Sequence, residues 1–136
     1  MNRPVPDVES DDYRPFWEAA RDHRIVIHRC ARCWAYRWPP RPICRVCHSL
    51  DFEWGEVGQR GTLHTWTVVV HQTLPGFPPP YVVGLVELGD ANRVRMLGNV
   101  VGVPAEDLRI GMPMKTVFEA VTPTVTLINW GPIEGD

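Results

Sequence analysis

Four cysteines lie in the first half of the chain, and their spacing is typical of a metal site. Two residues separate the cysteines within each pair, and ten residues separate the pairs. Two intervening residues allow both sulfurs of a pair to reach one ion, and a hairpin of ten residues can bring the second pair opposite the first. Because Zn²⁺ prefers four tetrahedral thiolates at structural sites, we expect one zinc ion per chain. The predicted ligands are Cys30, Cys33, Cys44 and Cys47.

The same cysteines leave some alternatives open. Iron binds four thiolates in a rubredoxin-like site, and a single Cys-x2-Cys pair can act as a redox couple. His48 directly follows Cys47 and could replace one thiolate. A site closed by four protein ligands has no open coordination position. The metal is therefore expected to fold a segment that is too small to hold a core, and not to be catalytic.

No set of catalytic residues is evident in the sequence. It contains no Ser-His-Asp spacing, nucleophile elbow or glycine-rich phosphate loop. His64 and His71 are predicted to lie in one strand on opposite faces, which argues against a catalytic pair. If all four cysteines bind metal, no cysteine nucleophile remains. We therefore expect no catalysis by the chain alone.

Charge is unevenly distributed along the chain. Residues 1–48 contain nine Arg and six acidic residues, whereas residues 49–136 contain four Arg, one Lys and ten acidic residues. Between Arg21 and Arg45 the only acidic residue is Asp22. The total net charge of -2 does not indicate a generally basic nucleic-acid-binding protein.

The sequence predicts a cytoplasmic protein without a membrane partner. Its first residues, MNRPVPDVESDD, are polar and acidic and lack the apolar stretch of a signal peptide. No apolar run approaches the roughly 20 residues that a membrane-spanning helix needs. In the reducing environment of the cytoplasm, four cysteines favour a metal site over disulfides.

The first elements must position the cysteines. A mobile tail is predicted for residues 1–10, followed by a helix over residues 12–22 with Asp11 or Asp12 as its N-cap. Apolar residues at helical spacing give this helix one apolar face, which either packs on the rest of the protein or docks on a partner chain. Residues 24–29 and 34–38 alternate like strands before several prolines interrupt the pattern.

The remainder of the chain, from about residue 59, is predicted to be all-β. Five apolar and β-branched runs occur, and PAEDLRIG between the third and the fourth predicts a single helical turn. This order predicts a small five-stranded OB-fold barrel, although an SH3-like barrel or a small sandwich would give a similar pattern. The predicted units are a tail and helix over residues 1–24, a zinc ribbon over 25–57 and the barrel over 58–136.

Several motifs together resemble a known family, the zinc-ribbon/OB-fold acyl-CoA-associated proteins (domain of unknown function thirty-five). The resemblance covers about residues 12–130 and implies an N-terminal helix, a rubredoxin-like zinc ribbon and an OB-fold. One departure is Trp34, where the family commonly has Gly after the first cysteine pair, and this affects the local turn. The matching motifs are FWEAARDHRIVIHRC, CARCWAYRWPPRPICRVCHS, DFEW with the glycines that follow it, PPYVVGLVEL and RIGMPMKTVFE.

The resemblance implies a non-catalytic accessory subunit. Members of the family accompany thiolase-like enzymes, including lipid-transfer-protein-type thiolases and aldolases that act on acyl-CoA thioesters, and some serve in steroid side-chain degradation. By resemblance, the chain stabilises such a complex and helps to form its CoA or acyl-CoA site. A two-plus-two assembly with a dimeric partner is the stoichiometry that the resemblance suggests.

Two groups of residues suit contact with CoA or with the partner. Arg37, Arg41 and Arg45 could make charge-assisted hydrogen bonds to the phosphate groups of CoA. Phe77 and Tyr81, in and after the proline-rich loop LPGFPPP, offer a stiff apolar edge for a partner or an acyl chain. The alternatives are a solvated ribbon surface with scattered ion pairs and an ordinary surface turn.

Other classes of function remain as alternatives. A ribbon joined to an OB-fold also occurs in nucleic-acid-binding proteins, where a basic groove and aromatic platforms hold single strands. Here the barrel half is acidic and its aromatic residues lie mostly within apolar runs, so binding of nucleic acid is disfavoured. An accessory chain of a C-acyltransferase and an independent enzyme are the further alternatives.

Overall fold

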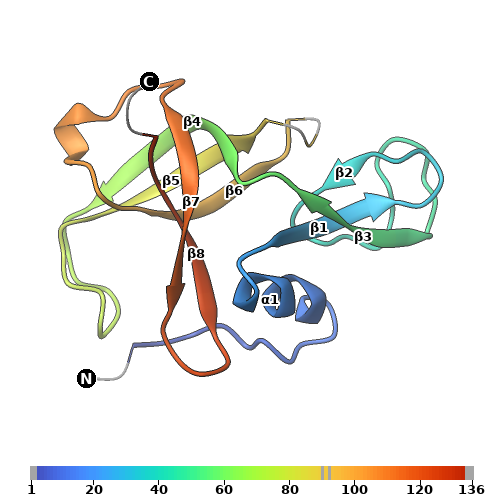
Figure 1. Ribbon diagram of the computed structural model, residues 1–136, viewed down its shortest axis with the longest axis horizontal. Helices are drawn as coiled ribbons and strands as arrows, with labels where there is room; N and C mark the ends of the chain where they lie inside the picture. Colours follow the sequence, from blue (N-terminus) through green and yellow to red (C-terminus); the bar gives the residue numbers. More distant parts are fainter. Residues whose placement is uncertain (1–2, 90, 92, 134–136) are drawn as a thin grey trace.

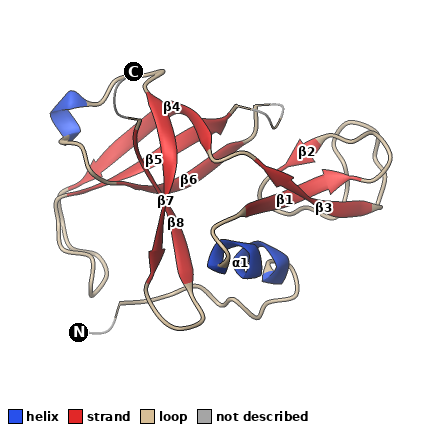
Figure 2. Cartoon of the chain, in the orientation of Figure 1, coloured by secondary structure: helices blue, strands red, loops and turns tan. Residues whose placement is uncertain are grey.

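The computed structural model describes residues 3–89, 91 and 93–133. A three-stranded sheet lies beside a closed barrel, and a short helix packs against both of them (Figure 1). The fold is mainly β with an N-terminal helix, as predicted (Figure 2). The elements are α1 (Arg14–Arg21), β1 (Ile25–Cys30), β2 (Tyr36–Arg37), β3 (Phe52–Val57), β4 (Arg60–Val69), β5 (Tyr81–Leu88), β6 (Arg95–Val100), the 3₁₀ helix η1 (Ala105–Asp107), β7 (Pro113–Ala120) and β8 (Thr126–Pro132).

Helix α1 is shorter than the predicted span of residues 12–22. Its N-cap is Tyr13, and no side chain caps the first turn. Neither predicted cap is used. The carboxylate of Asp11 pairs with the guanidinium of Arg14 at 2.9 Å, and the helix begins at Arg14, two residues after Asp12. The predicted N-cap was therefore wrong, since an acidic residue before a helix can pair with a nearby arginine instead of the free backbone N–H groups.

The apolar face of α1 packs on the rest of the protein. Packing of this kind was one of the two predicted roles of the face, and docking on a partner chain was the other. Phe16, Ala19 and Ala20 are buried on this face. The ring of Phe16 stacks on Trp38, with 4.4 Å between the ring centroids. The helix thereby attaches to the ribbon, and it also contacts β8 of the barrel.

The N-terminal segment is attached to the barrel at Arg3, although residues 1–10 were predicted to be a mobile tail. Arg3 Nη1 donates to Glu119 Oε2 at 2.9 Å, and its guanidinium lies 4.5 Å from the ring centroid of Phe77. An ion pair and a cation–π contact together hold this arginine, a long-range arrangement that the local sequence does not encode.

The ribbon is an antiparallel sheet with the strand order β2–β1–β3. Strand β1 lies one residue later than predicted. Strand β2 has only two residues, where a strand over residues 34–38 was predicted. The backbone of Trp34 takes a left-handed conformation with φ of 66°, so the chain is still turning at this residue and cannot yet pair as a strand.

The barrel has the strand order β4–β5–β6–β8–β7, and pairing of β4 with β7 closes it. This order and the helical turn η1 between β6 and β7 agree with an OB-fold. Strands β6 and β8 run parallel and pair at one register position, Val100 with Trp130. Strand β4 ends at Val69, whose partner Tyr81 begins β5. His71 therefore lies outside the strand that contains His64, and the prediction of one shared strand was wrong.

One apolar core joins the ribbon and the barrel. Ile25, Ile27 and Val57 of the ribbon belong to the same buried cluster as Leu63 and Trp130 of the barrel. Burial of each such side chain contributes about 1.5–3 kcal/mol relative to its exposure to water. The shared core fixes the ribbon relative to the barrel. No helix in the described part of the chain is long and apolar enough to cross a membrane.

Candidate metal centre and adjoining cavities

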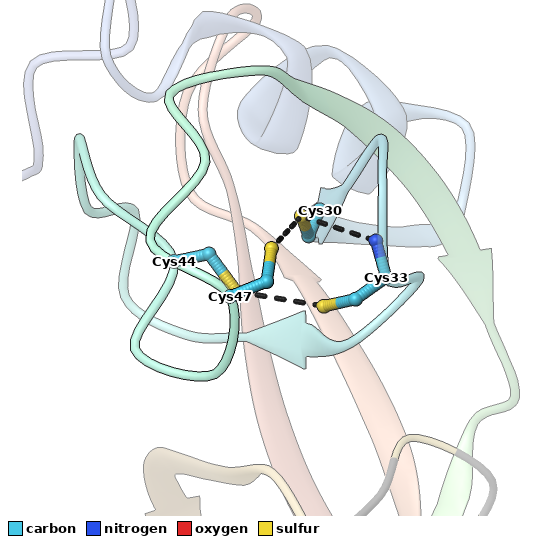
Figure 3. Close-up of side chains that lie close together, drawn as sticks. All are labelled: Cys30, Cys33, Cys44 and Cys47. Atoms are coloured by element: carbon cyan, nitrogen blue, oxygen red, sulfur yellow. Dashed lines mark hydrogen bonds between the residues drawn. The ribbon is translucent and has the colours of Figure 1, made fainter.

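The four predicted cysteine ligands converge on one point in the ribbon (Figure 3). Cys30 ends β1 and Cys33 lies in the turn before β2, whereas Cys44 and Cys47 lie in the connection between β2 and β3. All four Sγ atoms lie within 4.8 Å of one another. Cys30 Sγ lies 3.5 Å from Cys47 Sγ, and Cys33 Sγ lies 3.6 Å from Cys44 Sγ.

These distances fit a tetrahedral metal ion. Zinc–sulfur bonds of about 2.3 Å in a tetrahedron place the sulfurs about 3.8 Å apart, which is close to the spacing observed. The metal-ligating group found in the described residues consists of the four cysteines without His48. None of the four cysteines forms a disulfide. The arrangement therefore suits a closed four-thiolate site, which stabilises the fold and leaves no position for a substrate.

Backbone N–H groups prepare the sulfurs for the metal. The N–H groups of Cys33 and Arg32 lower the pKa of the Cys30 thiol to about 6, and both approach Cys30 Sγ at 3.5 Å or less. The N–H groups of Cys47 and Val46 likewise lower the pKa of Cys44. The pKa of Cys33 is lowered by the N–H of Ala35, but burial and the Cys44 side chain raise it to about 11. Four thiolates this close need a cation between them.

The two halves of the metal centre share one backbone conformation. Trp34 follows Cys33 and His48 follows Cys47, and both have left-handed backbones with φ of 66° and 64°. The N–H of Trp34 donates to the carbonyl of Cys30 at 3.1 Å. The left-handed turn explains why a glycine is suited to the position of Trp34, because glycine adopts positive φ without steric cost.

His28 lies beside the metal centre in β1. The ring is 4% exposed and stacks on Phe52 with 4.2 Å between centroids. Burial, and then the positive charge of Arg37, lower the pKa of His28 to about 4, so its imidazole is neutral near pH 7. It lines a cavity of about 350 Å³ with Asp12 and Trp54. No motif in the sequence marked His28 as a candidate site residue.

The three predicted arginines line one cavity of about 260 Å³ between the ribbon and the barrel. Arg37 is 9% exposed, and its Nη2 donates to the carbonyl of Arg41 at 2.9 Å. The barrel adds Arg93 and Arg95 to the same cavity. Sequence reasoning missed these two because they lie in and after a turn of the barrel, and nothing local shows that this turn meets the ribbon.

Phe77 and Tyr81 lie elsewhere on the molecule. They line a separate cavity of about 520 Å³ on the barrel, with 5.9 Å between their ring centroids. Arg3 and Glu119 line the same cavity, and the hydrogen bond from Arg3 lowers the pKa of Glu119. None of the three predicted arginines lines this cavity. The structure therefore separates the two predicted contact groups.

A fourth cavity lies between α1, the ribbon and strands β6 and β8. It has a volume of about 580 Å³ and a mostly apolar lining that includes Phe16, Trp38, Leu97 and Ile128. It adjoins the arginine-lined cavity, because Trp38 and Arg95 line both.

Comparison with known proteins agrees with this architecture. Residues 17–53 match the family model described as "ChsH2, rubredoxin-like zinc ribbon domain", and residues 54–119 match that of "ChsH2, C-terminal OB-fold domain". A solved structure described as "Ltp2-ChsH2(DUF35) aldolase" contains a chain that is 36% identical, with a TM-score of 0.82 over 96% of this chain and 98% of that chain. The chain belongs to the DUF35 family. The resemblance proposed from its motifs is thus confirmed.

Two curated relatives of this DUF35 protein are longer. One, from Thermomonospora curvata, is named "Probable enoyl-CoA hydratase alpha subunit" and is 39% identical over 96% of this chain. Another, from Mycobacterium tuberculosis, is named "3-oxo-4,17-pregnadiene-20-carboxyl-CoA hydratase alpha subunit" and is 32% identical over 92% of this chain. The chain spans 40% and 39% of the lengths of these two relatives.

Proposed function

We propose that this DUF35 protein is a non-catalytic, zinc-binding accessory subunit of a thiolase-like acyl-CoA enzyme, either a thiolase or a retro-aldolase. The observation that carries the proposal is the similarity, over nearly the whole chain, to a chain of the structure described as "Ltp2-ChsH2(DUF35) aldolase". The relative from M. tuberculosis is named for a steroid-derived CoA thioester, which favours a role in steroid side-chain or other lipid degradation. The location that we propose is the cytoplasm.

In this proposal the partner carries out the chemistry and the zinc ribbon has a structural role. One zinc ion per chain, bound by the four cysteines, holds together a segment whose strand β2 has only two residues. Folding of so small a segment is coupled to metal binding. The ordered ribbon then stabilises the complex and presents its arginines.

The proposal includes contact with CoA. Arg37, Arg41 and Arg45 line one cavity, and their guanidinium groups suit the phosphate groups of CoA through charge-assisted hydrogen bonds. Phe77 and Tyr81 line a different cavity and remain predicted contacts for the partner or an acyl chain. One face of the subunit would then contribute to the CoA site, and another to the interface.

Co-expression tests this function. The tagged chain is produced together with a lipid-transfer-protein-type thiolase or aldolase of its host, and the purified material is analysed by mass spectrometry and for zinc. We expect a stoichiometric complex with about one zinc per chain, and acyl-CoA cleavage by the complex but not by the chain alone. Recovery of zinc-loaded chain without an enzyme partner, or with bound nucleic acid instead, would contradict the proposal.

A cysteine variant tests the role of the metal within the complex. Cys44→Ser removes one ligand from the cluster of four, so zinc content and partner capture should both fall. Half-buried Ser10 is far from the cluster in sequence, and Ser10→Ala serves as a control that should retain both zinc and partner binding. A Cys44→Ser chain with full zinc content and full partner binding would contradict the ligand assignment.

A further inference from the structure

We propose that the barrel cavity lined by Phe77 and Tyr81 is a binding site for an arginine side chain on an extended segment of a partner polypeptide. Arg3 of the chain's own N-terminal segment occupies this site when no partner is bound. The inference rests on the proposed function only in naming the partner, which is the enzyme subunit. It gives the cavity a definite ligand chemistry, that of a guanidinium group attached to a peptide backbone.

Two groups in the cavity suit a guanidinium. Both carboxylate oxygens of Glu119 accept hydrogen bonds, Oε2 from Arg3 Nη1 and Oε1 from Asn129 Nδ2, each at 2.9 Å. Asn129 is buried and thus fixes the orientation of the carboxylate. The centroid of the Phe77 ring lies 4.5 Å from the guanidinium carbon of Arg3. A fixed carboxylate and an aromatic ring face are both favourable partners for a planar guanidinium.

The charge of the lining also favours a cation. Apart from Arg3, the charged side chains among the described residues that line the cavity are those of Glu106 and Glu119. When the side chain of Arg3 leaves, two carboxylates remain in an otherwise uncharged wall. Their attraction favours a cation as the replacement over a neutral or an anionic group. The site therefore differs in kind from the arginine-lined cavity, which suits phosphate groups.

The loop before β5 accommodates the backbone of the bound segment. Gly76 has a left-handed backbone with φ of 79°. A Cβ atom at this position would lie 2.8 Å from Cα and 2.7 Å from Cβ of Arg3. Glycine is suited to Gly76 both by this conformation and by the close approach. Pro4 follows Arg3 and favours an extended conformation for it. The site thus contacts the main chain of an extended segment as well as its guanidinium.

Arg3 is held weakly enough to be exchanged. The side chains of Arg3 and Glu119 are 27% and 41% exposed, and a pair of this kind contributes less than about 1 kcal/mol. Arg3 Nε is buried without a hydrogen-bond partner in the described part of the chain. Among residues 3–8, Arg3 alone makes a described hydrogen bond to the barrel. The N-terminal segment therefore behaves as a tethered ligand with an effective concentration in the millimolar range.

Space beside Arg3 allows a partner segment to make further contacts. The cavity has a volume of about 520 Å³ with Arg3 in place, and Val101, Val103 and Pro104 form an apolar part of its wall. An apolar residue next to the arginine of a partner segment would bury surface there. Such a segment can therefore displace the N-terminal segment of the chain.

Peptide binding to the zinc-loaded full chain tests the site. The probe is an acetylated peptide with the sequence of residues 1–10, MNRPVPDVES, titrated to millimolar concentration while the NMR signals of Phe77 and Tyr81 are followed. The Arg3→Ala chain should bind this peptide with a dissociation constant of about 1 mM or less. The unmodified chain should bind it at least about threefold more weakly, because its own segment competes. Equal affinities of the two chains, or no binding by Arg3→Ala, would overturn the inference.

A variant peptide and a second substitution identify the groups that carry the binding. The peptide with Arg3→Gln should bind the Arg3→Ala chain at least about tenfold more weakly, because it offers no charge to Glu119. Adding Glu119→Gln to the Arg3→Ala chain should weaken the unmodified peptide to a similar extent. Glu18→Gln in the same chain is the matched control, because Glu18 is exposed and does not line the cavity. Equal effects of Glu119→Gln and Glu18→Gln would show that the inference is wrong.

Capture of the enzyme partner tests the role of the site in the complex. Arg3→Ala frees the site and should capture the enzyme at least as well as the unmodified chain. Glu119→Gln should reduce capture at least about fivefold. Undiminished capture by Glu119→Gln would overturn the assignment of the site to the partner. If the unmodified chain captures no enzyme, the accessory role is wrong, and the peptide titration still decides whether the arginine site exists.

Discussion

At the scale of single residues, Trp34 holds the first half of the metal centre in a conformation that side chains disfavour. Its φ of 66° lies in the left-handed region, and its ring is 56% exposed with the guanidinium of Arg29 4.7 Å from its centroid. The cation–π contact offsets part of the steric cost. Substitutions at Trp34 can separate the cation–π contact from the steric cost of the left-handed backbone.

Comparison of Trp34→Gly with Trp34→Ala measures the backbone cost. Both variants lose the contact with Arg29, but only alanine retains a side chain at positive φ. We expect the glycine variant to be more stable than the alanine variant by about 1 kcal/mol, as determined by denaturant unfolding with zinc present. Both should retain full zinc content, and equal stability of the two would contradict the assigned conformation.

Glu119 makes the stability of the chain depend on pH. The hydrogen bond from Arg3 lowers the pKa of Glu119 in the folded state. The pair therefore stabilises the fold above the ordinary glutamate pKa of about 4.5 and loses this effect as the pH falls through the lowered value. The unfolding free energy should fall between about pH 7 and pH 3, and it should fall less in the Arg3→Gln variant. The difference should be less than about 1 kcal/mol, because the side chains of Arg3 and Glu119 are both partly exposed.

The control for this pH dependence is Arg14→Gln. Arg14 also pairs with a carboxylate, but the Asp11 side chain in that pair is 90% exposed. The Arg14→Gln substitution should leave the pH dependence of the unfolding free energy unchanged. If Arg3→Gln behaves in the same way as this control, the attachment of the N-terminal segment to Glu119 contributes nothing to stability.

The metal ligands could be predicted from sequence, whereas the full set of cavity arginines could not. The spacing of two residues within a cysteine pair is a local feature that fixes how both sulfurs reach one ion. The sequence alone therefore predicts Cys30 and Cys33 as ligands. Arg93 and Arg95 become candidates only when β6 is known to meet the ribbon. His28 was missed because nothing local shows that Phe52 and Trp54 of β3 bury it.

At the scale of elements, α1 connects the ribbon to the barrel. The helix contacts β1 of the ribbon and β8 of the barrel. Its existence followed from the apolar spacing, but its first residue did not, because Asp11 pairs with Arg14 and no side chain caps the helix. The length of β2 was also overestimated, since alternation of residue types does not reveal the left-handed turn at Trp34.

Phe16→Ala should weaken this connection. The ring is 5% exposed and stacks on Trp38, and its removal leaves a cavity that costs about 3 kcal/mol. Glu18→Ala, an exposed position on the same helix, should change the unfolding free energy by less than about 0.5 kcal/mol. Zinc content should be unaffected by either substitution, and a loss of zinc in Phe16→Ala would contradict the separation of helix packing from metal binding.

Hydrogen exchange should distinguish β5 from β6. Strand β5 pairs along its length with β4 and β6, so its amides should be protected at every residue except near its ends. Strand β6 pairs along one edge with β5 but at a single position with β8. Its amides should therefore alternate between slow and fast exchange. Uniform slow exchange along β6 would show that β6 and β8 pair more extensively.

At the scale of the whole molecule, the ribbon and the barrel share one core but differ in what stabilises them. The barrel encloses its own apolar side chains, such as Leu63, Val86 and Met114. The outer part of the ribbon instead has exposed apolar residues, including Val46 and Leu50. The strand count and the position of the helical turn predicted the OB-fold, but the way in which the ribbon meets the barrel depends on contacts between distant segments.

Removal of zinc should unfold the outer ribbon before the barrel. With a chelator present, amide protection should be lost over residues 31–51 while the amides of β5 remain protected, and the melting temperature should fall by more than about 10 °C. Restoring zinc should reverse both changes. Simultaneous loss of protection in the ribbon and in β5 would show instead that the metal sustains the whole fold.

The aromatic packing around α1 gives the chain an optical reporter of its own. Trp38 lies against Phe16 of the helix and near Trp54 of the ribbon. It lines both the arginine-lined cavity and the apolar cavity between α1, the ribbon, β6 and β8. Indole fluorescence responds to the polarity around the ring. Movement of the helix, release of the metal or entry of a ligand would thus each alter the intrinsic emission of the unlabelled protein, and replacement of Trp38 by phenylalanine would identify its share of that signal.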